Sequence, residues 1–199
     1  MSFKIQISKE LSLDIRKCAH LLIFGNGNDW SDFAKRIERQ IDYVYQCEQK
    51  ANEQAIFVFH CLGGCLCERE KQQLDERYEL LSAFNFSNIE QFNRKFCCES
   101  LYYHVIFANL SAKKQKIDDL KQILMKGRAV GMCVIMFVDS VKVIDKDLID
   151  MFPVKLVYKV KTEKESVLLT GGKIAKNLKK NEFVIAELGK KAVIYENNL

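Results

Sequence analysis

The sequence is poor in the residues that interrupt secondary structure, with one proline and nine glycines among 199 residues. It has no proline-, glycine- or serine-rich stretch of the kind that links domains, so we expect a single domain over residues 1–199. No apolar run approaches the roughly 18 residues that span a bilayer. The opening residues, MSFKIQISKE, also lack the basic and apolar regions of a secretory signal. These absences predict a cytoplasmic protein with no membrane segment.

Histidine is scarce, whereas cysteine is not: the chain has three His and eight Cys. Without a secretory signal, these cysteines are expected to be reduced thiols. A zinc site would have to draw on Cys61, Cys65, Cys67, Cys97 and Cys98. Cys65 and Cys67 are separated by a single residue, whereas structural zinc sites use pairs with two to four residues between them. We therefore expect no metal site.

Charge of one sign is in excess in only one part of the chain. The net charge is +5. Residues 1–150 hold 21 Lys and Arg against 21 Asp and Glu, whereas residues 151–199 hold ten Lys against five Glu. A local excess of positive charge suits a polyanionic partner, above all nucleic acid.

Short runs dense in β-branched and aromatic residues recur along the chain, and most lack the alternation of a half-exposed strand. Such strands are buried on both faces, which is typical of a parallel sheet covered by helices. The expected strands are 20–24, 55–59, 102–107, 132–138, 154–160, 183–187 and 192–195.

The segments between these runs have apolar residues at three- and four-residue spacing, which predicts helices over 29–50, 68–83, 88–96 and 113–126. Gly127 and Gly131 bracket the exit of the last helix. The alternation predicts a doubly wound α/β fold, with a mainly parallel twisted sheet and helices on both faces. Ligands of such sheets bind beyond the carboxyl ends of the strands, so the loop after residue 24 is the first candidate site.

Four stretches are distinctive when taken together and in order. They are HLLIFG at 20–25, LDERYELLSAFNFSNIEQFN at 74–93, KGRAVGMCVIM at 126–136, and FPVKLVYKV at 152–160 with the later residues 171–182. In order and spacing they resemble the motor domain of the FtsK/SpoIIIE family of DNA-pumping ATPases. The first is similar to the strand entering the Walker A loop, the second to a helix pair, and the third to the passage into the sensor strand. The fourth resembles the family's F-P-x-R-I-A-F-x-V strand.

The resemblance covers residues from about 8 to 187 and implies a RecA-like P-loop NTPase fold. It also implies the context of such motors, which are bacterial, form hexameric rings and translocate duplex DNA with ATP. Phosphoryl transfer in this fold requires a glycine-rich loop, a lysine that reaches the phosphates, a hydroxyl on Mg²⁺ and an acidic strand end.

The Walker A loop departs from this requirement. Residues 25–32 read GNGNDWSD where the motors have G-x-x-x-x-G-K-S. Gly25 keeps the first glycine, but Trp30 stands at the second, Ser31 at the lysine and Asp32 at the hydroxyl. Carboxylates beside a triphosphate oppose its binding, since two unit charges about 4 Å apart interact by about 4 kcal/mol at an effective dielectric constant near 20.

The other parts of the ATPase site depart as well. Either Ala108 and Asn109 or Asn109 and Leu110 stand where the motors have an acidic pair, and Asp139 lies where they have the sensor passage. Lys155 matches the arginine of the F-P-x-R strand and keeps its positive charge. We therefore predict that neither ATP nor Mg²⁺ binds tightly, that the chain has no catalytic residue and that hydrolysis has been lost.

The resemblance then implies a DNA-associated or motor-assembly module related to DNA translocation or segregation. The expected partners are double-stranded DNA and either further copies of this chain or related active ATPase subunits. Lys113, Lys114 and Lys116 follow the third expected strand, where the motors place a loop facing DNA, and are candidate phosphate contacts. A lysine cluster of this kind is otherwise a solvated helix start.

Two alternatives stay open. In the first alternative to this module, the chain is a degenerate ATPase module of an EssC/EccC-like type VII secretion system, which binds protein partners or a secretion substrate. In the second, it is an active DNA-translocating ATPase with an unconventional site.

Overall fold

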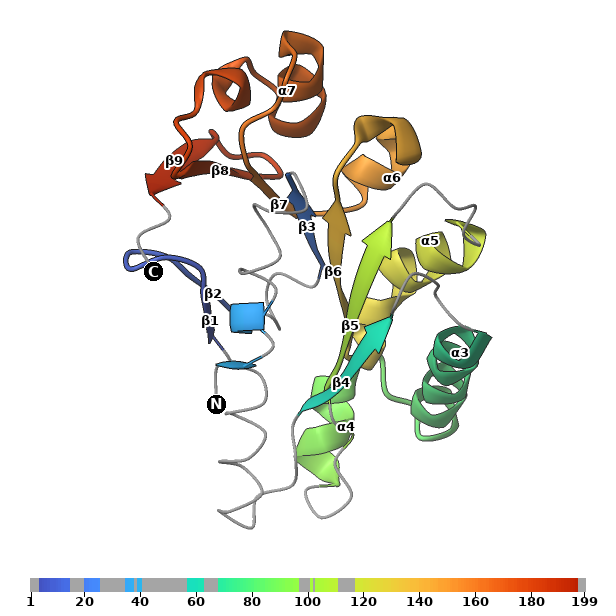
Figure 1. The fold of residues 1–199 in the computed structure, drawn as a ribbon. Coiled ribbons are helices and arrows are strands. Elements are labelled where there is room, and N and C mark those ends of the chain that lie inside the picture. The colour runs from blue at the N-terminus through green and yellow to red at the C-terminus, as the bar shows by residue number, and fades with distance from the viewer. Residues whose placement is uncertain are drawn as a thin grey trace.

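The computed structural model describes residues 4–14, 20–25, 35–37, 39–40, 57–62, 68–96, 101, 103–110 and 117–196. Within them, the strands form a two-stranded hairpin and a seven-stranded sheet (Figure 1). The strands are β1 Lys4–Gln6, β2 Ser12–Asp14, β3 His20–Phe24, β4 Phe57–Leu62, β5 Tyr103–Leu110, β6 Met132–Val138, β7 Val154–Val157, β8 Glu182–Glu187 and β9 Val193–Glu196.

The helices follow the strands along the chain. They are α3 Glu68–Ala83, α4 Ile89–Lys95, α5 Ile117–Lys126, α6 Lys146–Asp150 and α7 Glu163–Thr170, with the 3-10 turns η1 Gly127–Val130, η2 Val141–Val143 and η3 Ile174–Asn177. Residues 35–37 and 39–40 are also helical. None of the helices described is both long and apolar enough to cross a bilayer.

The seven-stranded sheet has the order β4-β5-β6-β3-β7-β8-β9. The first five strands are parallel to one another, and β8 and β9 run antiparallel to their neighbours. The chain leaves β3, crosses to the edge at β4, returns through β5 and β6, and then passes β3 to form β7. The winding therefore reverses at β3, the kind of position where parallel α/β sheets bind ligands. This topology confirms the mainly parallel α/β fold expected from the sequence.

The central strands pack their side chains alternately into two apolar layers. Strand β6 is buried along its whole length, with Met132 and Val134 in one layer and Cys133 and Ile135 in the other. Helices α3, α5, α6 and α7 contribute to the first layer, and Figure 1 shows α3 and α5 on one side of the sheet. The β1–β2 hairpin and the buried Ile37 contribute to the second. Burial on both faces explains why these strands read as continuous apolar runs.

The sequence predicts the long central elements and, to within one residue, the short α4, β8 and β9, but it misses four other short elements. β3, β6 and α3 have the expected bounds. β5 extends three residues beyond its apolar run, to Leu110, because Asn109 and Leu110 still pair with β6. The sequence pattern does not reveal β1, β2, α6 or α7, which have three to eight residues and too few turns for a clear period. Much of the expected helix 29–50, and residues 113–116, lie outside the described part of the chain.

Two of the four distinctive stretches, 74–93 and 126–136, pack against each other at the amino ends of the strands. The buried Arg77 of α3 donates from Nη1 to the carbonyl of Val130 at 2.8 Å, and the hydroxyl of Tyr78 donates to the carbonyl of Lys126 at 3.0 Å. Gly131, which ends η1, adopts a left-handed φ of 75° and lies against Ile89 of α4. These contacts join α3, α4 and η1 to the start of β6.

His20 is a structural residue at the start of β3. Its Nδ1 accepts the backbone N–H of Val134 at 3.1 Å, inside the core. Burial lowers the pKa of His20 to about 4, hydrogen bonding to the Leu124 backbone opposes this shift, and the positive charge of Arg128 adds to it. The imidazole is therefore neutral at neutral pH and available as an acceptor.

The contact between Gly131 and Ile89 can be tested with a matched pair of glycines. An alanine Cβ at 131 would lie 2.5 Å from Cδ1 of Ile89, whereas one at Gly171, with φ 74°, would meet no atom within 4 Å. We expect Gly131→Ala to lower the free energy of unfolding by about 3 kcal/mol, from left-handed strain plus overpacking, and Gly171→Ala by about 1 kcal/mol, from strain alone. Urea denaturation measures both values.

A second variant separates strain from contact at this glycine. Ile89→Val removes the Cδ1 methyl, so the Gly131→Ala/Ile89→Val double variant should recover part of the stability that Gly131→Ala removes. Equal losses of stability in Gly131→Ala and Gly171→Ala would contradict the role of the contact.

Candidate functional site

Three neighbouring strand ends meet where the winding of the sheet reverses. Phe24, the last residue of β3, lies opposite Val138 of β6 and Val157 of β7. The backbone N–H of Gly25 donates to the Val138 carbonyl at 3.1 Å, and the N–H of Tyr158 donates to the Phe24 carbonyl at 2.9 Å. The hydrogen-bonded ladder therefore continues past the last residues of β3 and β7 and holds Gly25 beside Tyr158.

The side chain of Tyr158 packs directly on Gly25. A Cβ placed on Gly25 would lie 2.9 Å from Cδ2 and 3.1 Å from Cβ of Tyr158, closer than packed side chains allow. Tyr158 is 3% exposed, and its ring centroid lies 6.0 Å from that of Phe183 in β8. Gly25 thus makes room for an aromatic side chain. The first glycine of a phosphate-binding loop instead allows the backbone to approach a phosphate.

β5 ends without the acidic pair that the resemblance to the motors places there, whereas β6 is followed by a carboxylate. β5 ends in Ala108, Asn109 and Leu110, and the buried Ala108 packs in the same apolar layer as Met136. Asp139 follows β6 directly and is exposed. Because Gly25 bonds to the residue before Asp139, this carboxylate lies at the same edge of the sheet as Gly25.

Lys155 is placed apart from this group. It lies opposite Leu22 of β3, two residues before the end of β7, and is 8% exposed. Burial lowers the pKa of Lys155, and the negative charge of Asp150 at the end of α6 opposes the shift. The register therefore brings Gly25, Asp139 and Tyr158 together and leaves Lys155 further back in the sheet.

The other predicted site residues lie outside the described part of the chain. These are Trp30, Ser31, Asp32, Lys113, Lys114 and Lys116, together with the side chain of Asn109. The cysteines weighed for zinc also fall outside the described side chains, and Cys133 is buried in β6.

Tyr158 is the residue of this site that sequence reasoning misses. It belongs to the apolar run 152–160 and reads as an ordinary core residue of a buried strand. Its contact with Gly25 depends on the pairing of β3 with β7, two strands separated by more than 100 residues. No signal in the local sequence indicates this pairing.

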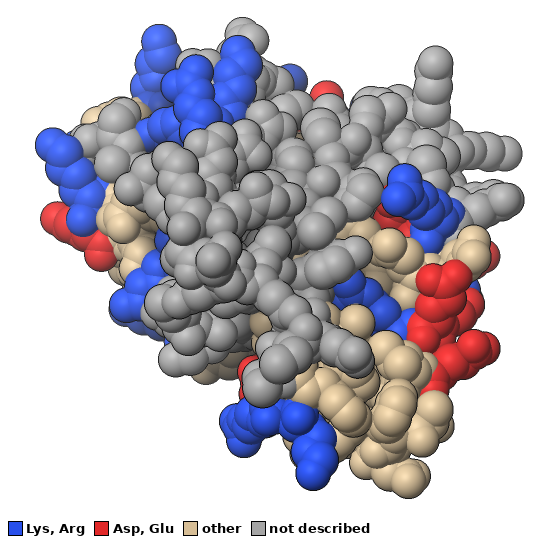
Figure 2. Space-filling view, turned by 90° about the horizontal axis from the view of Figure 1, so that it is seen from below, with Lys and Arg blue, Asp and Glu red and all other residues tan. Residues whose placement is uncertain are grey.

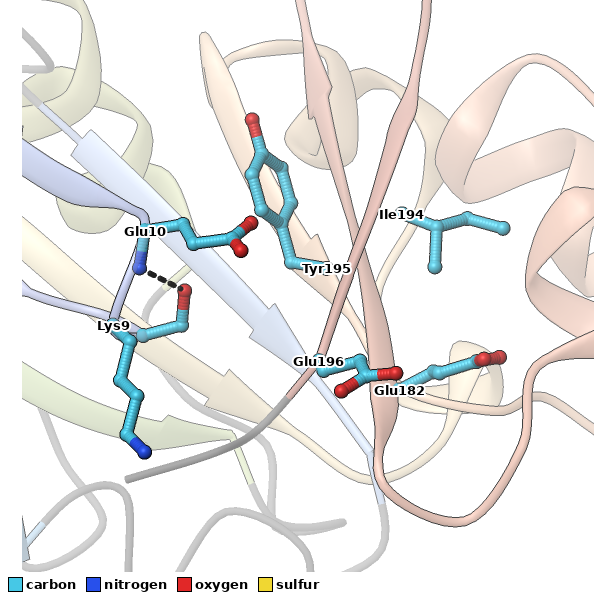
Figure 3. A pocket seen from close by; sticks show the side chains of 7 residues that line it. Lys9, Glu10, Glu182, Ile194, Tyr195 and Glu196 are labelled. Carbon is cyan, nitrogen blue, oxygen red and sulfur yellow. Dashed lines mark hydrogen bonds between the residues drawn. The ribbon is translucent and has the colours of Figure 1, made fainter.

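A hollow of about 430 Å³ lies two strands away from β3, between the β1–β2 turn and the β8–β9 hairpin. Figure 3 shows Tyr195 and Glu10 on one side of β9, with Glu196 and Glu182 close together on the other. Its lining also includes Ser8, Lys9 and Ile194. Three carboxylates in one small hollow do not suit a triphosphate.

A second hollow of about 430 Å³ lies at the opposite end of the sheet. It is lined by residues 87–90 at the start of α4, by Tyr103, and by Met125, Lys126, Arg128 and Ala129 near the end of α5. Figure 2 views the molecule from this end, where acidic side chains gather mainly on the right and basic ones are scattered around the rim. Neither hollow includes Gly25, Asp139 or Tyr158 in its lining.

Comparison with solved structures defines the class of fold. The chain is similar to the pCW3 conjugation coupling protein TcpA, determined as a monomer with ATPγS, at 19% identity and a TM-score of 0.71; the match covers 94% of this chain and 62% of that one. The cytoplasmic domain of the Thermomonospora curvata type VII secretion ATPase EccC has 14% identity and a TM-score of 0.67, covering 98% of this chain and 28% of that one. ATPases 2 and 3 of EssC from Geobacillus thermodenitrificans have 14% identity and a TM-score of 0.66; this match covers 95% of the present chain and 42% of the EssC chain.

The protein therefore has the RecA-like α/β fold that these ATPase structures share. It spans less than two thirds of the length of each of these three structures. No family model matches its sequence, and no curated protein matches it. The likeness is thus carried by the three-dimensional arrangement of the strands and helices.

The contact between Gly25 and Tyr158 predicts a specific coupling between two substitutions. Gly25→Ala should lower the free energy of unfolding by about 1–3 kcal/mol, because the new methyl overlaps the tyrosine ring. In the background of Tyr158→Leu, which removes the ring, Gly25→Ala should cost about 1 kcal/mol less. Equilibrium denaturation of the four proteins of this cycle measures the coupling. Additive effects, within about 0.5 kcal/mol, would contradict it.

Proposed function

We propose that this domain keeps the RecA-like frame without hydrolysing ATP and acts as a DNA-associated or motor-assembly module related to DNA translocation or segregation. The observation that carries the proposal is the combination at the carboxyl edge of the sheet. Gly25 packs against Tyr158, β5 ends in Ala108 and Asn109, and Asp139 adds a carboxylate. None of these groups carries the positive charge that would offset a triphosphate, and the end of β5 lacks the acidic pair that the resemblance places there.

The charge at this edge supports the loss of nucleotide binding. A P-loop relies on a lysine ammonium and oriented backbone N–H groups to offset the charge of the phosphates. Here the sequence of the loop offers Asp29, Asp32 and Ser31 and no lysine, and Asp139 stands at the next strand end. Repulsion of about 4 kcal/mol from one nearby carboxylate would weaken binding by roughly three orders of magnitude.

The likeness to TcpA supports the DNA branch of the proposal. TcpA is a conjugation coupling protein, and its similarity covers 94% of this chain at a TM-score of 0.71. The type VII secretion ATPase EccC and the ATPases 2 and 3 of EssC have TM-scores of 0.67 and 0.66. That likeness favours a second candidate function, in which the domain is a degenerate ATPase module that binds protein partners or a secretion substrate.

Calorimetry with ATP and magnesium tests the loss of nucleotide binding. We expect no binding tighter than about 1 mM, because the loop lacks the lysine and carries carboxylates. The matched variant Trp30→Gly/Ser31→Lys/Asp32→Thr restores the Walker A residues and should bind more tightly than the natural chain. Micromolar affinity in the natural chain would overturn the proposal and favour the active ATPase with an unconventional site.

A salt titration of duplex DNA binding tests the DNA role. We expect binding at about 50 mM salt that weakens steeply by 200 mM, since phosphate contacts release counterions. The affinity should be the same for duplexes of unrelated sequence, because backbone contacts carry no sequence information. Absence of binding at low salt would remove the DNA role and leave the secretion candidate ahead.

A further inference from the structure

The positive charge of the chain is concentrated on one small region after β7. Residues 159–180 contain seven lysines and two glutamates, a net charge of +5, which equals the net charge of the whole protein. The rest of the chain is therefore neutral overall. All seven lysines are exposed. This region, which we call the α7–η3 surface, consists of residues 159–162, α7, residues 171–173, η3 and residues 178–180.

The segments of the α7–η3 surface are held together by buried hydrogen bonds. Ser166 is fully buried; its hydroxyl donates to the carbonyl of Gly172 at 2.6 Å and accepts the N–H of Ala175 at 3.0 Å. The N–H of Val160 donates to the carbonyl of Ala175 at 3.2 Å. α7 begins with a capping box in which Thr162 and Glu165 bond reciprocally. The lysines therefore project from a fixed backbone.

The acidic side chains of this region leave most of its positive charge available. Glu163 pairs with Lys173 at 2.8 Å and lies 3.9 Å from Lys176, and all three side chains are 43–68% exposed. Exposed pairs of this kind contribute at most about 1 kcal/mol, so a stronger anion can replace them.

Four further lysines have no acidic partner among the residues that the structure describes. They are Lys159, Lys161, Lys164 and Lys180, whereas the seventh, Lys179, lies 3.6 Å from Glu182. Together with the weakly paired lysines, they form a surface whose positive charge is solvated by water and balanced by counterions.

The composition of the surface decides between classes of polyanion. Residues 159–181 contain no arginine and no aromatic residue. Single-stranded nucleic acid is bound by stacking bases on aromatic side chains, and protein interfaces are anchored by Trp, Tyr and Arg. Lysine alone is a point charge that contacts phosphates without reading sequence. The composition therefore favours the regular phosphate backbone of a duplex.

We infer that the α7–η3 surface binds the phosphate backbone of duplex DNA, independently of its sequence. The inference rests on the proposed DNA role and assigns it to residues other than Lys113, Lys114 and Lys116. Figure 1 shows α7 beyond the ends of the central strands, on the opposite side of the molecule from α4. The carboxyl edge of the sheet, where Gly25 and Asp139 lie, and the α7–η3 surface would then be neighbours.

Two charge-matched variants of the full chain test this inference. The first, Lys159→Gln/Lys161→Gln/Lys164→Gln/Lys180→Gln, removes the four lysines of the α7–η3 surface that have no described acidic partner. The control, Lys4→Gln/Lys9→Gln/Lys95→Gln/Lys126→Gln, removes four exposed lysines from β1, the β1–β2 turn, α4 and the end of α5. Both have the same net charge. Circular dichroism and thermal unfolding should show both folded, because every replaced side chain is exposed.

Binding to a duplex of about 20 base pairs is measured by fluorescence anisotropy between 50 and 200 mM salt. The slope of log K against log salt is negative, and its magnitude should be smaller by about 3 in the first variant. Each phosphate that no longer meets a lysine ammonium reduces this magnitude by nearly one unit. In the control variant the magnitude of the slope should decrease by less than about 1. Affinity of the first variant at 50 mM salt should decrease at least about 100-fold.

Three outcomes would overturn the inference. Equal slopes in the two variants, with DNA binding intact in the natural chain, would exclude this surface and leave the DNA role standing. If the natural chain does not bind duplex DNA at 50 mM salt, both this inference and the proposed DNA role are wrong. Polyglutamate could compete for the surface as strongly as unlabelled DNA does, and binding of polyglutamate could be lost in the first variant. That result would assign the surface to an acidic protein.

Discussion

The hydrogen-bonded position of β3 between β6 and β7 is the constraint on which the rest of the structure depends. All five residues of β3 are buried, and both of its edges pair with parallel neighbours. A shift of one residue would turn every side chain of the strand to the opposite layer, so the register is strongly fixed. The same register determines that Gly25 meets Tyr158 and lies beside the residue that precedes Asp139. The composition of the candidate site is thus a consequence of core packing.

The two ends of the sheet carry different parts of the resemblance to DNA-pumping motors. The stretches 74–93 and 126–136 meet at the amino ends, where Arg77 bonds to Val130 and Tyr78 to Lys126. The residues that depart from the motors, which include Ala108 and Asp139, lie at the carboxyl ends. Contacts that hold the fold are therefore separated in space from those that would serve nucleotide chemistry. A chain can lose the second set while the first keeps the domain folded.

This separation also explains what the sequence can predict. The buried runs 20–24 and 132–138 and the helix 68–83 each contain enough residues to show a period or a continuous apolar pattern. β1, β2 and α6 have at most five residues, and their formation depends on the layer against which they pack. The same holds for the site. Gly25 stands out by its place after a strand, whereas Tyr158 becomes part of the site through long-range pairing that no local pattern encodes.

Under the proposed function, the distribution of charge suits binding rather than chemistry. At the carboxyl edge of the sheet, Asp139 and the carboxylates of the loop sequence would repel a polyanion, whereas the α7–η3 surface would attract one. In an active motor the hydrolysis of ATP alternates between states that hold DNA and states that release it, and each state needs its own contacts. A domain without nucleotide binding has no such alternation, so its contact with DNA would be governed by affinity and salt alone. Its physical role would then be to stay attached to the duplex, or to neighbouring subunits, while other proteins perform work.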